Sequence, residues 1–471
     1  MNKELNTLSI TEAAAMLEAG ETTSLALTRA CLAEIEKRNP SLNAYLEVFT
    51  DAEDQAKLAD ERRAKGEKGK LLGIPLAIKD NILIEGRVAS AASKMLENYV
   101  ATYDATVIKK LKEAGVVFLG RTNMDEFAMG GSTENSAFGT TKNPLDESRV
   151  PGGSSGGSAS VVAAHMALGA LGTDTGGSIR EPASFCGLVG LKPTYGGVSR
   201  FGAIALGSSL DQIGPLTKTV EDAKIIHDAI KGNDPLDSTT IAENEYPHQQ
   251  TSASRRIGVP RHLLKEGVEP DVLARFEEAL LKLQSQGYEI VDVEIPSAAL
   301  ALAIYYIIMP AEASTNLARY DSIRYGFSKK GESLFDDYAT SRGAGFGPEP
   351  RRRIMLGTYV LSAGYYDAYY GKAGIARQKL SAEVANALER CDAIVTPTAP
   401  CPATKLGEKS DPLSMYLMDI FTVTANLTGN PAISIPMGTV QRDGADLPVG
   451  IQLTAAHGDE DTLFALGALL G

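Results

Sequence analysis

GGSSGGS at Gly152–Ser158 and GTDTGGSIR at Gly172–Arg180 are two glycine-rich turns that decide how this chain folds. Ser154 lies in the first turn, and Ser178 follows it by 24 residues in the second. The segment between the serines reads as a helix followed by a strand, and glycine permits the tight turns that such a return requires. We therefore predict that both serines lie near one point at a sheet edge.

The chain around these turns alternates between apolar runs and helical segments. The apolar runs are Leu76–Ile78, Val116–Leu119, Leu168–Leu171 and Leu188–Leu191, and the helical segments are 105–114, 158–167 and 220–231. Alternation of this kind is typical of an α/β layer with a parallel or mixed sheet.

The sequence before this core predicts helices. Thr11 can cap a helix over Glu12–Ala19, and a second helix from Thr23 or Ser24 should end at Arg38, because Pro40 cannot continue it.

We predict one α/β domain over the whole chain. Its parts are N-terminal helices (1–70), a core (71–230), a polar connection (232–256), a helical insertion (257–390) and strands that rejoin the first sheet (391–471).

Composition excludes several classes of protein. The chain has 471 residues, 44% of them hydrophobic, and a net charge of −13, so it is globular but poorly suited to grip nucleic acid by its phosphates. Its four cysteines form no C-x-x-C pair, which favours reduced thiols in a cytoplasmic protein. No stretch approaches about 18 uninterrupted apolar residues, and no metal-binding motif is present, so we expect neither a membrane span nor a metal site.

Lys79 ends the apolar run Leu71–Ile78. Burial there would lower the pKa of its amine, because desolvation penalises the charged form. A neutral amine could accept a proton from a serine. The alternative interpretation is a charged lysine at a strand end, paired with Asp80.

The second glycine turn can bind an oxyanion. Around Thr175, Gly176 and Gly177, consecutive backbone N–H groups can point into one concavity, and such donors stabilise the negative oxygen formed during acyl transfer. The alternative is a tight loop that binds nothing.

The first turn also matches a different motif. Gly152–Gly156 satisfies G-x-S-x-G, the nucleophile elbow of α/β-hydrolases. That fold needs a late histidine as base, and of the five histidines only His457 is suitably placed in chain order. We therefore favour the lysine as base.

Together, these segments resemble the amidase signature family. The resemblance rests on Gly152–Ser160, Gly172–Pro182 and Cys186–Thr194, read with Ile78–Asn81. It implies the amidase signature fold, a large mixed β-sheet covered by helices on both faces. It also implies a Ser–cis-Ser–Lys triad, in which Ser178 is the nucleophile, Ser154 the bridging serine with a cis peptide bond, and Lys79 the base.

Within this family the chain looks like the glutaminase subunits of tRNA-dependent amidotransferases. The segments that carry this finer resemblance are Ser132–Gly139, Val198–Gly202, Ser208–Pro215, Glu312–Asp321 and Arg352–Thr358. One departure is Glu181, where the resemblance leads us to expect glutamine.

The finer resemblance implies a glutamine site. The substrate carboxylate would bind Arg353 or Arg352, its ammonium group would bind Asp419, and Tyr306 or Tyr305 would add a hydrogen bond. Without the resemblance, the arginines would read as a solvated cluster.

The same resemblance implies partners, namely the B and C subunits of an amidotransferase. This chain would hold no cofactor and would supply ammonia to an amide-forming ligase. The B subunit would bind ATP, Mg²⁺ and the misacylated tRNA, and the small C subunit would complete a heterotrimer. The alternatives are a stand-alone amidase of the same family and a catalytically silent scaffold.

Overall fold

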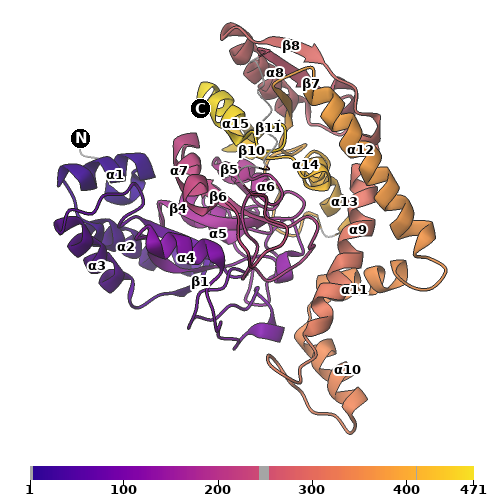
Figure 1. Ribbon diagram of the computed structural model, residues 1–471, viewed down its shortest axis with the longest axis horizontal. Coiled ribbons are helices and arrows are strands. Elements are labelled where there is room, and N and C mark those ends of the chain that lie inside the picture. Colours follow the sequence, from indigo (N-terminus) through magenta and orange to yellow (C-terminus); the bar gives the residue numbers. More distant parts are fainter. Residues whose placement is uncertain (1–3, 243–244, 246–253, 410) are drawn as a thin grey trace.

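The computed structural model describes residues 4–242, 245, 254–409 and 411–471. In this part of the chain one sheet of 11 strands runs in the order β1-β3-β2-β4-β6-β5-β10-β11-β9-β7-β8 (Figure 1). The strands are β1 (Tyr45–Val48), β2 (Pro75–Lys79), β3 (Val117–Thr122), β4 (Gly169–Asp174), β5 (Val189–Lys192), β6 (Gln212–Thr217), β7 (Arg256–Val259), β8 (Glu289–Asp292), β9 (Ala393–Pro397), β10 (Ala432–Arg442) and β11 (Ala445–Thr454).

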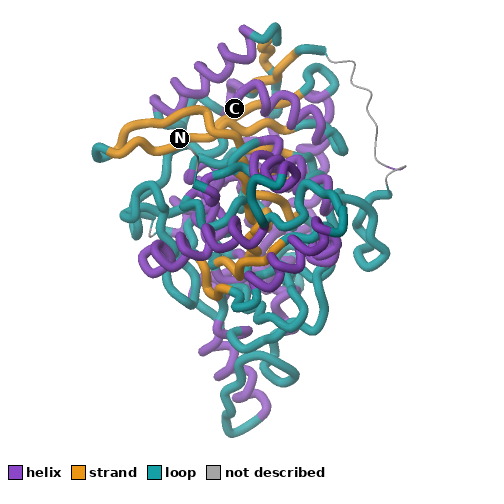
Figure 2. Tube along the Cα trace, turned by 90° about the vertical axis from the view of Figure 1, so that its left-hand side faces the viewer, coloured by secondary structure: helices purple, strands orange, loops and turns teal. Residues whose placement is uncertain are grey.

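Helices cover this sheet, and in Figure 2 the strands run through the middle of the molecule, while one long hairpin reaches its edge. The helices are α1 (Ile10–Ala19), α2 (Ser24–Leu42), α3 (Ala52–Ala64), α4 (Thr106–Glu113), α5 (Gly156–Ala163), α6 (Arg180–Cys186), α7 (Val220–Ile230), α8 (Pro270–Ser285), α9 (Ala301–Asn316), α10 (Leu334–Gly345), α11 (Pro348–Val360), α12 (Lys372–Leu388), α13 (Pro412–Tyr416), α14 (Val423–Thr428) and α15 (Glu460–Leu470). The predicted fold class, a mixed sheet covered by helices, is confirmed.

The strand order places the two serine turns. β2 is parallel to both β3 and β4, so Lys79 at the end of β2 and Asp174 at the end of β4 lie at the same edge of the sheet. The first glycine turn precedes α5, and the second follows β4 directly. Both turns therefore emerge beside Lys79.

The C-terminal strands lie in the same sheet as the N-terminal ones. β10 runs antiparallel to β5, with Ala432 opposite Lys192, and β11 joins β10 to β9. The hairpin of β10 and β11 continues beyond the Pro436–Gly450 pair as a paired ribbon, with an irregular register between Pro436 and Thr439.

The helices α9 to α12 form an arm that extends away from the sheet (Figure 1). α9 packs against α11, α12 and α14. Its buried side chains Ile304, Tyr305 and Ile308 belong to a hydrophobic core that also contains Leu206, Phe346 and Val423. The helical stretch Pro296–Arg319 is long and apolar enough to cross a membrane, with a mean hydropathy of 1.4. Half of its most apolar 18-residue segment is buried in the protein, as in the core helix of a globular domain.

Two predicted helix boundaries were wrong. α1 begins at Ile10 because Ser9, not Thr11, caps it: Ser9 Oγ accepts from the Glu12 N–H at 3.0 Å, and the Glu12 carboxylate accepts from the Ser9 N–H at 2.9 Å. α2 continues through Pro40 to Leu42, since a proline in the last turn removes only one backbone donor. In the predicted connection over 232–256, residues 243–244 and 246–253 lie outside the described residues.

Candidate active site

A buried lysine forms the centre of the site. Lys79 ends β2, and its side chain has no access to solvent. Its Nζ lies 2.8 Å from Ser154 Oγ, 2.8 Å from Ser155 Oγ and 2.9 Å from Thr173 Oγ1. Thr173 belongs to β4, the parallel neighbour of β2. The amine thus faces three hydroxyl groups in a space that excludes bulk water.

Burial also governs the charge of this amine. Desolvation lowers the pKa of Lys79 to about 7, although the carboxylates of Asp125, Asp174 and Asp211 oppose that shift. Near neutral pH a large fraction of the amine is therefore uncharged and can accept a proton.

Asp80 does not pair with this lysine. Its carboxylate accepts hydrogen bonds from the Ser90 N–H at 3.1 Å and the Ala92 N–H at 2.8 Å, and it forms an ion pair with Arg121 at 2.9 Å. The alternative interpretation of a Lys79–Asp80 pair is therefore wrong.

The two serine turns contact each other. The Ser155 N–H donates to the Ser178 carbonyl oxygen at 3.2 Å, and the Gly153–Ser154 peptide bond is cis. Ser154 is fully buried against the lysine, whereas Ser178 keeps 8% of its surface exposed. The structure thus brings both serines and the lysine together, with Ser178 as the serine that a solute can reach.

A buried ion pair fixes the second turn. Asp174 binds Arg180 through Nη2 at 2.9 Å and Nε at 3.0 Å, and both side chains are inaccessible to solvent. Burial alone would raise the pKa of Asp174, but the Arg180 guanidinium and Asn426 outweigh burial and lower it to about 2. Arg180 also binds Gln452 at 2.6 Å, which ties the turn to β11.

The Asp174 carboxylate also shows that one predicted oxyanion donor, the Gly177 N–H, is already in use. Asp174 Oδ1 accepts the Gly177 N–H at 2.9 Å, so that amide already has an acceptor. Thr175 directs its hydroxyl to Asp211 at 2.7 Å and away from the turn. The backbone N–H groups of Thr175, Gly176 and Ser178 stay the candidate donors.

Both glycines of this turn occupy places where a side chain would collide. A Cβ at Gly176 would lie 2.6 Å from the Tyr305 hydroxyl, and a Cβ at Gly177 would collide with Thr422 Oγ1. Gly177 also has φ +141°, a conformation that favours glycine. Tyr305 therefore packs directly over the predicted oxyanion turn.

An arginine lies among aromatic rings next to Tyr305. Arg353 is buried, and its Nε binds Glu349 at 2.7 Å. Its guanidinium carbon lies 5.3 Å from the ring centre of Tyr306 and 5.2 Å from that of Tyr416, two rings that stack 4.0 Å apart. The rings and the carboxylate hold the guanidinium in one orientation.

Asp419 adjoins this aromatic group. The Tyr306 hydroxyl donates to Asp419 Oδ2 at 3.3 Å. Burial raises the pKa of Asp419 to about 7, although the positive charge of Arg353 acts against this. Arg353, Tyr306 and Asp419 thus form one wall of the site, which carries a positive charge and an acid with a pKa near neutrality.

Arg352 is not part of this wall. Its side chain is 48% exposed and pairs with Oε2 of Glu349, whereas Arg353 binds Oε1. Of the two arginines left open by the sequence, Arg353 is the one beside Tyr306. Of the two tyrosines, Tyr306 contacts Asp419, and Tyr305 covers Gly176.

A family model described as Amidase matches residues 26–464. The chain belongs to the amidase family. A protein of Desulfatibacillum aliphaticivorans, named as the A subunit of glutamyl-tRNA(Gln) amidotransferase, is 52% identical over 471 residues, with 98% of this chain and 96% of the relative covered. A protein of the same name from Streptomyces coelicolor is 49% identical, with 98% and 95% covered.

Solved structures of other amidases share the fold. The glutamyl-tRNA(Gln) amidotransferase A subunit of Thermotoga maritima has a TM-score of 0.80 and 44% identity, with 98% of this chain and 94% of that one covered. The native peptide amidase of Stenotrophomonas maltophilia has a TM-score of 0.79 and 31% identity, with 98% and 96% covered.

The sequence did not identify several residues of this amidase site. Ser155 and Thr173 contact Lys79 as closely as Ser154 does, and Tyr416 and Glu349 complete the surroundings of Arg353. Of these residues, only Ser155 could have been found from the sequence, because it adjoins Ser154 within the glycine turn. Among the described residues, no group of three His, Cys, Asp or Glu side chains could hold a metal ion.

His457 does not serve either serine turn. Its Nε2 lies 2.8 Å from the Thr428 carbonyl oxygen, next to Gly429. The α/β-hydrolase interpretation of Gly152–Gly156 is therefore wrong, because its base would have to face Ser154.

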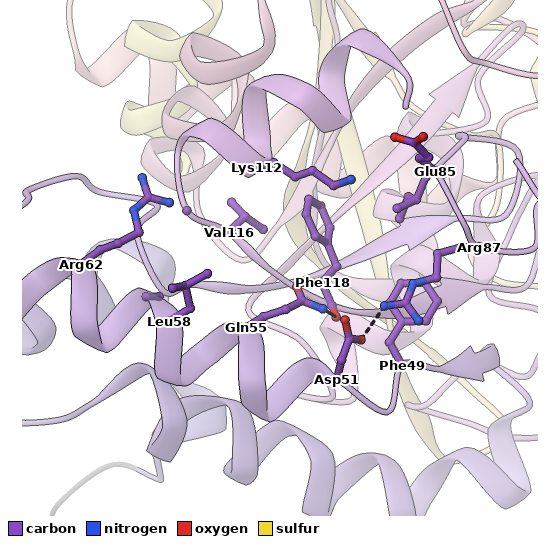
Figure 3. A pocket seen from close by; sticks show the side chains of 13 residues that line it. Phe49, Asp51, Gln55, Leu58, Arg62, Glu85, Arg87, Lys112, Val116 and Phe118 are labelled. Carbon is purple, nitrogen blue, oxygen red and sulfur yellow. Dashed lines mark hydrogen bonds and ion pairs between the residues drawn. The ribbon is translucent and has the colours of Figure 1, made fainter. Parts of the chain in front are cut away.

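A separate pocket of about 300 Å³ lies between α3 and the loop after β2 (Figure 3). Most of its charged side chains already have partners: Arg87 pairs with Asp51 at 2.5 Å and lies 4.3 Å from the ring centre of Phe49, and Lys112 pairs with Asp104 at 2.7 Å. Since most of its charges are neutralised within the protein and its lining includes neither a serine nor a buried amine, this pocket offers no set of groups for the amide chemistry described above.

Proposed function

We propose that this amidase is the glutamine-hydrolysing A subunit of a tRNA-dependent amidotransferase, which releases ammonia for the amidation of misacylated tRNA. The observation that carries the proposal is a buried amine with a pKa near 7 in contact with Ser154, beside a second serine turn and a wall with both an arginine and an acid. The relatives named as A subunits of glutamyl-tRNA(Gln) amidotransferase support this choice of substrate.

In this proposal the proton moves through two hydroxyl groups. Neutral Lys79 accepts the Ser154 proton, Ser154 accepts the Ser178 proton, and Ser178 Oγ attacks the side-chain carbonyl carbon of glutamine. Ser155 does not compete for the lone pair of the amine, because its hydroxyl donates to the Thr173 carbonyl oxygen at 3.1 Å.

The remaining steps return the proton. The carbonyl oxygen becomes an oxyanion held by the N–H groups of the turn at Gly176 and Ser178. The lysine proton passes back through Ser154 to the amide nitrogen, and ammonia leaves. Water then hydrolyses the glutamyl ester on Ser178 by the same relay.

The wall recognises the two charges of free glutamine. The Arg353 guanidinium suits the α-carboxylate, because a planar fork of N–H donors matches two carboxylate oxygens. Asp419, with Tyr306 beside it, suits the α-ammonium group, whose charge would favour the ionised form of the acid. Simple amides would lack both contacts.

The proposal assigns the remaining chemistry to partners. The B subunit would bind ATP, Mg²⁺ and the tRNA, and the C subunit would complete the heterotrimer. The net charge of −13 fits a chain that leaves tRNA binding to another protein of the complex. The four cysteines are buried and free, which fits the reducing cytoplasm where proteins are made.

A stand-alone amidase is the second candidate, favoured by the peptide amidase that shares this fold at 31% identity. Reconstitution with the B and C subunits separates the two. We expect the wild-type complex to amidate Glu-tRNA(Gln), Asp-tRNA(Asn) or both with glutamine as the nitrogen donor. The Ser178→Ala complex should not use glutamine and should amidate the tRNA only when ammonia is added. Fast hydrolysis of simple amides by the lone chain, with no gain from the partners, would favour the second candidate.

A further inference from the structure

Glu181 is a buried carboxyl group beside the site with no hydrogen-bond partner. It is the third residue after Ser178, in the first turn of α6, and only 1% of its surface is exposed. Neither Oε1 nor Oε2 accepts a hydrogen bond. Burial of an unpartnered acid is costly, and buried acids are ordinarily paired. This group is therefore missing a donor that a ligand could bring.

The Glu181 carboxyl group lies close to the backbone at Gly131, and the Glu181 backbone is bound to the second serine turn. The Glu181 N–H donates to the Gly177 carbonyl oxygen at 2.8 Å, which anchors the residue behind the second serine turn. A Cβ at Gly131 would lie 3.3 Å from Glu181 Oε2 and 3.4 Å from Met415 Sδ. The Gly153 N–H faces the carboxyl group but lies outside hydrogen-bond geometry.

The charges around Glu181 are negative. Burial raises its pKa well above the ordinary value, and the next largest contribution comes from Asp419, with Asp125 and Asp174 acting in the same direction. Asp419 itself accepts one hydrogen bond, the 3.3 Å contact from Tyr306. Asp419 is thus the carboxyl group that acts most strongly on Glu181, both acids have spare acceptor capacity, and a cation with several donors would serve both.

The geometry points to Glu181 as a specificity-determining residue that, together with Asp419, receives the α-ammonium group of the substrate. This inference rests on the proposed function, in which the substrate is free glutamine. An ammonium group has three N–H donors, so it can serve Asp419 and Glu181 at once. The glutamine side chain expected here in similar glutaminase subunits would offer one neutral acceptor instead of an ionisable acid.

The test compares two substrates in the reconstituted complex. Wild type and Glu181→Gln are assayed with glutamine and with 4-carbamoylbutanoate, which is glutamine without its α-amino group. We expect the substitution to raise KM for glutamine about tenfold, to leave kcat within about twofold, and to leave KM for the analogue unchanged, because a charged hydrogen bond is lost only with glutamine.

Two further variants keep the outcome interpretable. Glu181→Asp retains an ionisable acid and should restore part of the preference for glutamine. Glu460→Gln removes another buried carboxyl group, one that accepts from the Thr194 N–H at 2.8 Å on α15, and should leave both KM values unchanged. Thermal unfolding of each complex shows whether the variants fold.

Two results would overturn the inference. The first is an equal rise of KM for both substrates in Glu181→Gln, and the second is no change for glutamine. A failure of the proposed function looks different: the wild-type complex itself would then hydrolyse glutamine no better than the analogue.

Discussion

Lys79 and Lys192 are two buried lysines of the same sheet, and only one of them faces hydroxyl groups. Each ends a strand, β2 or β5, and burial lowers the pKa of each to about 7. The Lys79 amine touches Ser154, whereas the Lys192 amine donates to the carbonyl oxygen of Pro193 at 2.8 Å. Burial alone thus produces a neutral amine, and a neighbouring hydroxyl group gives that amine a proton to take.

The largest expected effect is the difference in kcat between matched substitutions of the two lysines. Lys79→Met should lower kcat for glutamine hydrolysis by at least about 10³-fold, because it removes the general base. Lys192→Met should keep kcat within about fivefold. Both variants are assayed with wild type in the reconstituted complex, and ammonia release is measured. Equal losses in the two variants would remove the functional distinction between the lysines.

The charge of Lys192 should affect the stability of the protein, although it has no part in catalysis. Its folded-state pKa is about 7 against an ordinary 10.5, so between these values the unfolded state binds more protons and the free energy of unfolding rises with pH. The cost of burying this amine is on the order of 5 kcal/mol below pH 7.

Lys192→Met should remove that cost. We expect a higher free energy of unfolding at pH 7 and a smaller gain between pH 7 and pH 9 than in the wild type. Denaturant unfolding at both pH values measures the effect. An identical pH dependence in variant and wild type would show that Lys192 is charged in the folded protein.

The pH profile of catalysis should belong to Lys79. Because its neutral form is the base and its pKa is about 7, kcat at saturating glutamine should rise about tenfold per pH unit below 7 and level off above it. Lys192→Met should leave this profile in place. A flat profile from pH 5 to pH 8 would contradict the assignment of the base.

The smallest effect concerns the hydroxyl groups that orient Lys79. Thr173→Val removes the 2.9 Å contact with the amine but keeps the shape of the side chain. We expect kcat to fall about tenfold with little change in KM, because the lysine loses one of the contacts that direct it to Ser154. Ser199→Ala, a buried serine bound to Asp234 at 2.6 Å, is the control and should leave kcat unchanged.

How far the sequence predicts this molecule depends on how local each signal is. Ser154 and Ser178 are marked by adjacent glycines, and Lys79 by the apolar run before it, so their residue types announce the chemistry. Thr173 carries no such mark, because its part in the site depends on the parallel pairing of β2 and β4.

The glutamine wall shows the same limit. Adjacent residues such as Arg352 and Arg353 differ only in the side of α11 that they occupy, and the packing of α11 on α9 decides which one is buried. The commitment of the Gly177 amide to Asp174 is likewise a matter of three-dimensional geometry. The helix boundary at Pro40 failed for a different reason, since the chain tolerates proline in a last helical turn.

The most direct test of the account is the titration of the Lys79 side chain in the assembled complex. With ¹³C-labelled lysine in the Lys192→Met background, the Cε chemical shift of Lys79, assigned by its loss in Lys79→Met, follows the charge of the amine with pH. The account predicts a midpoint near 7. An amine that stays cationic to pH 9 or above would contradict it.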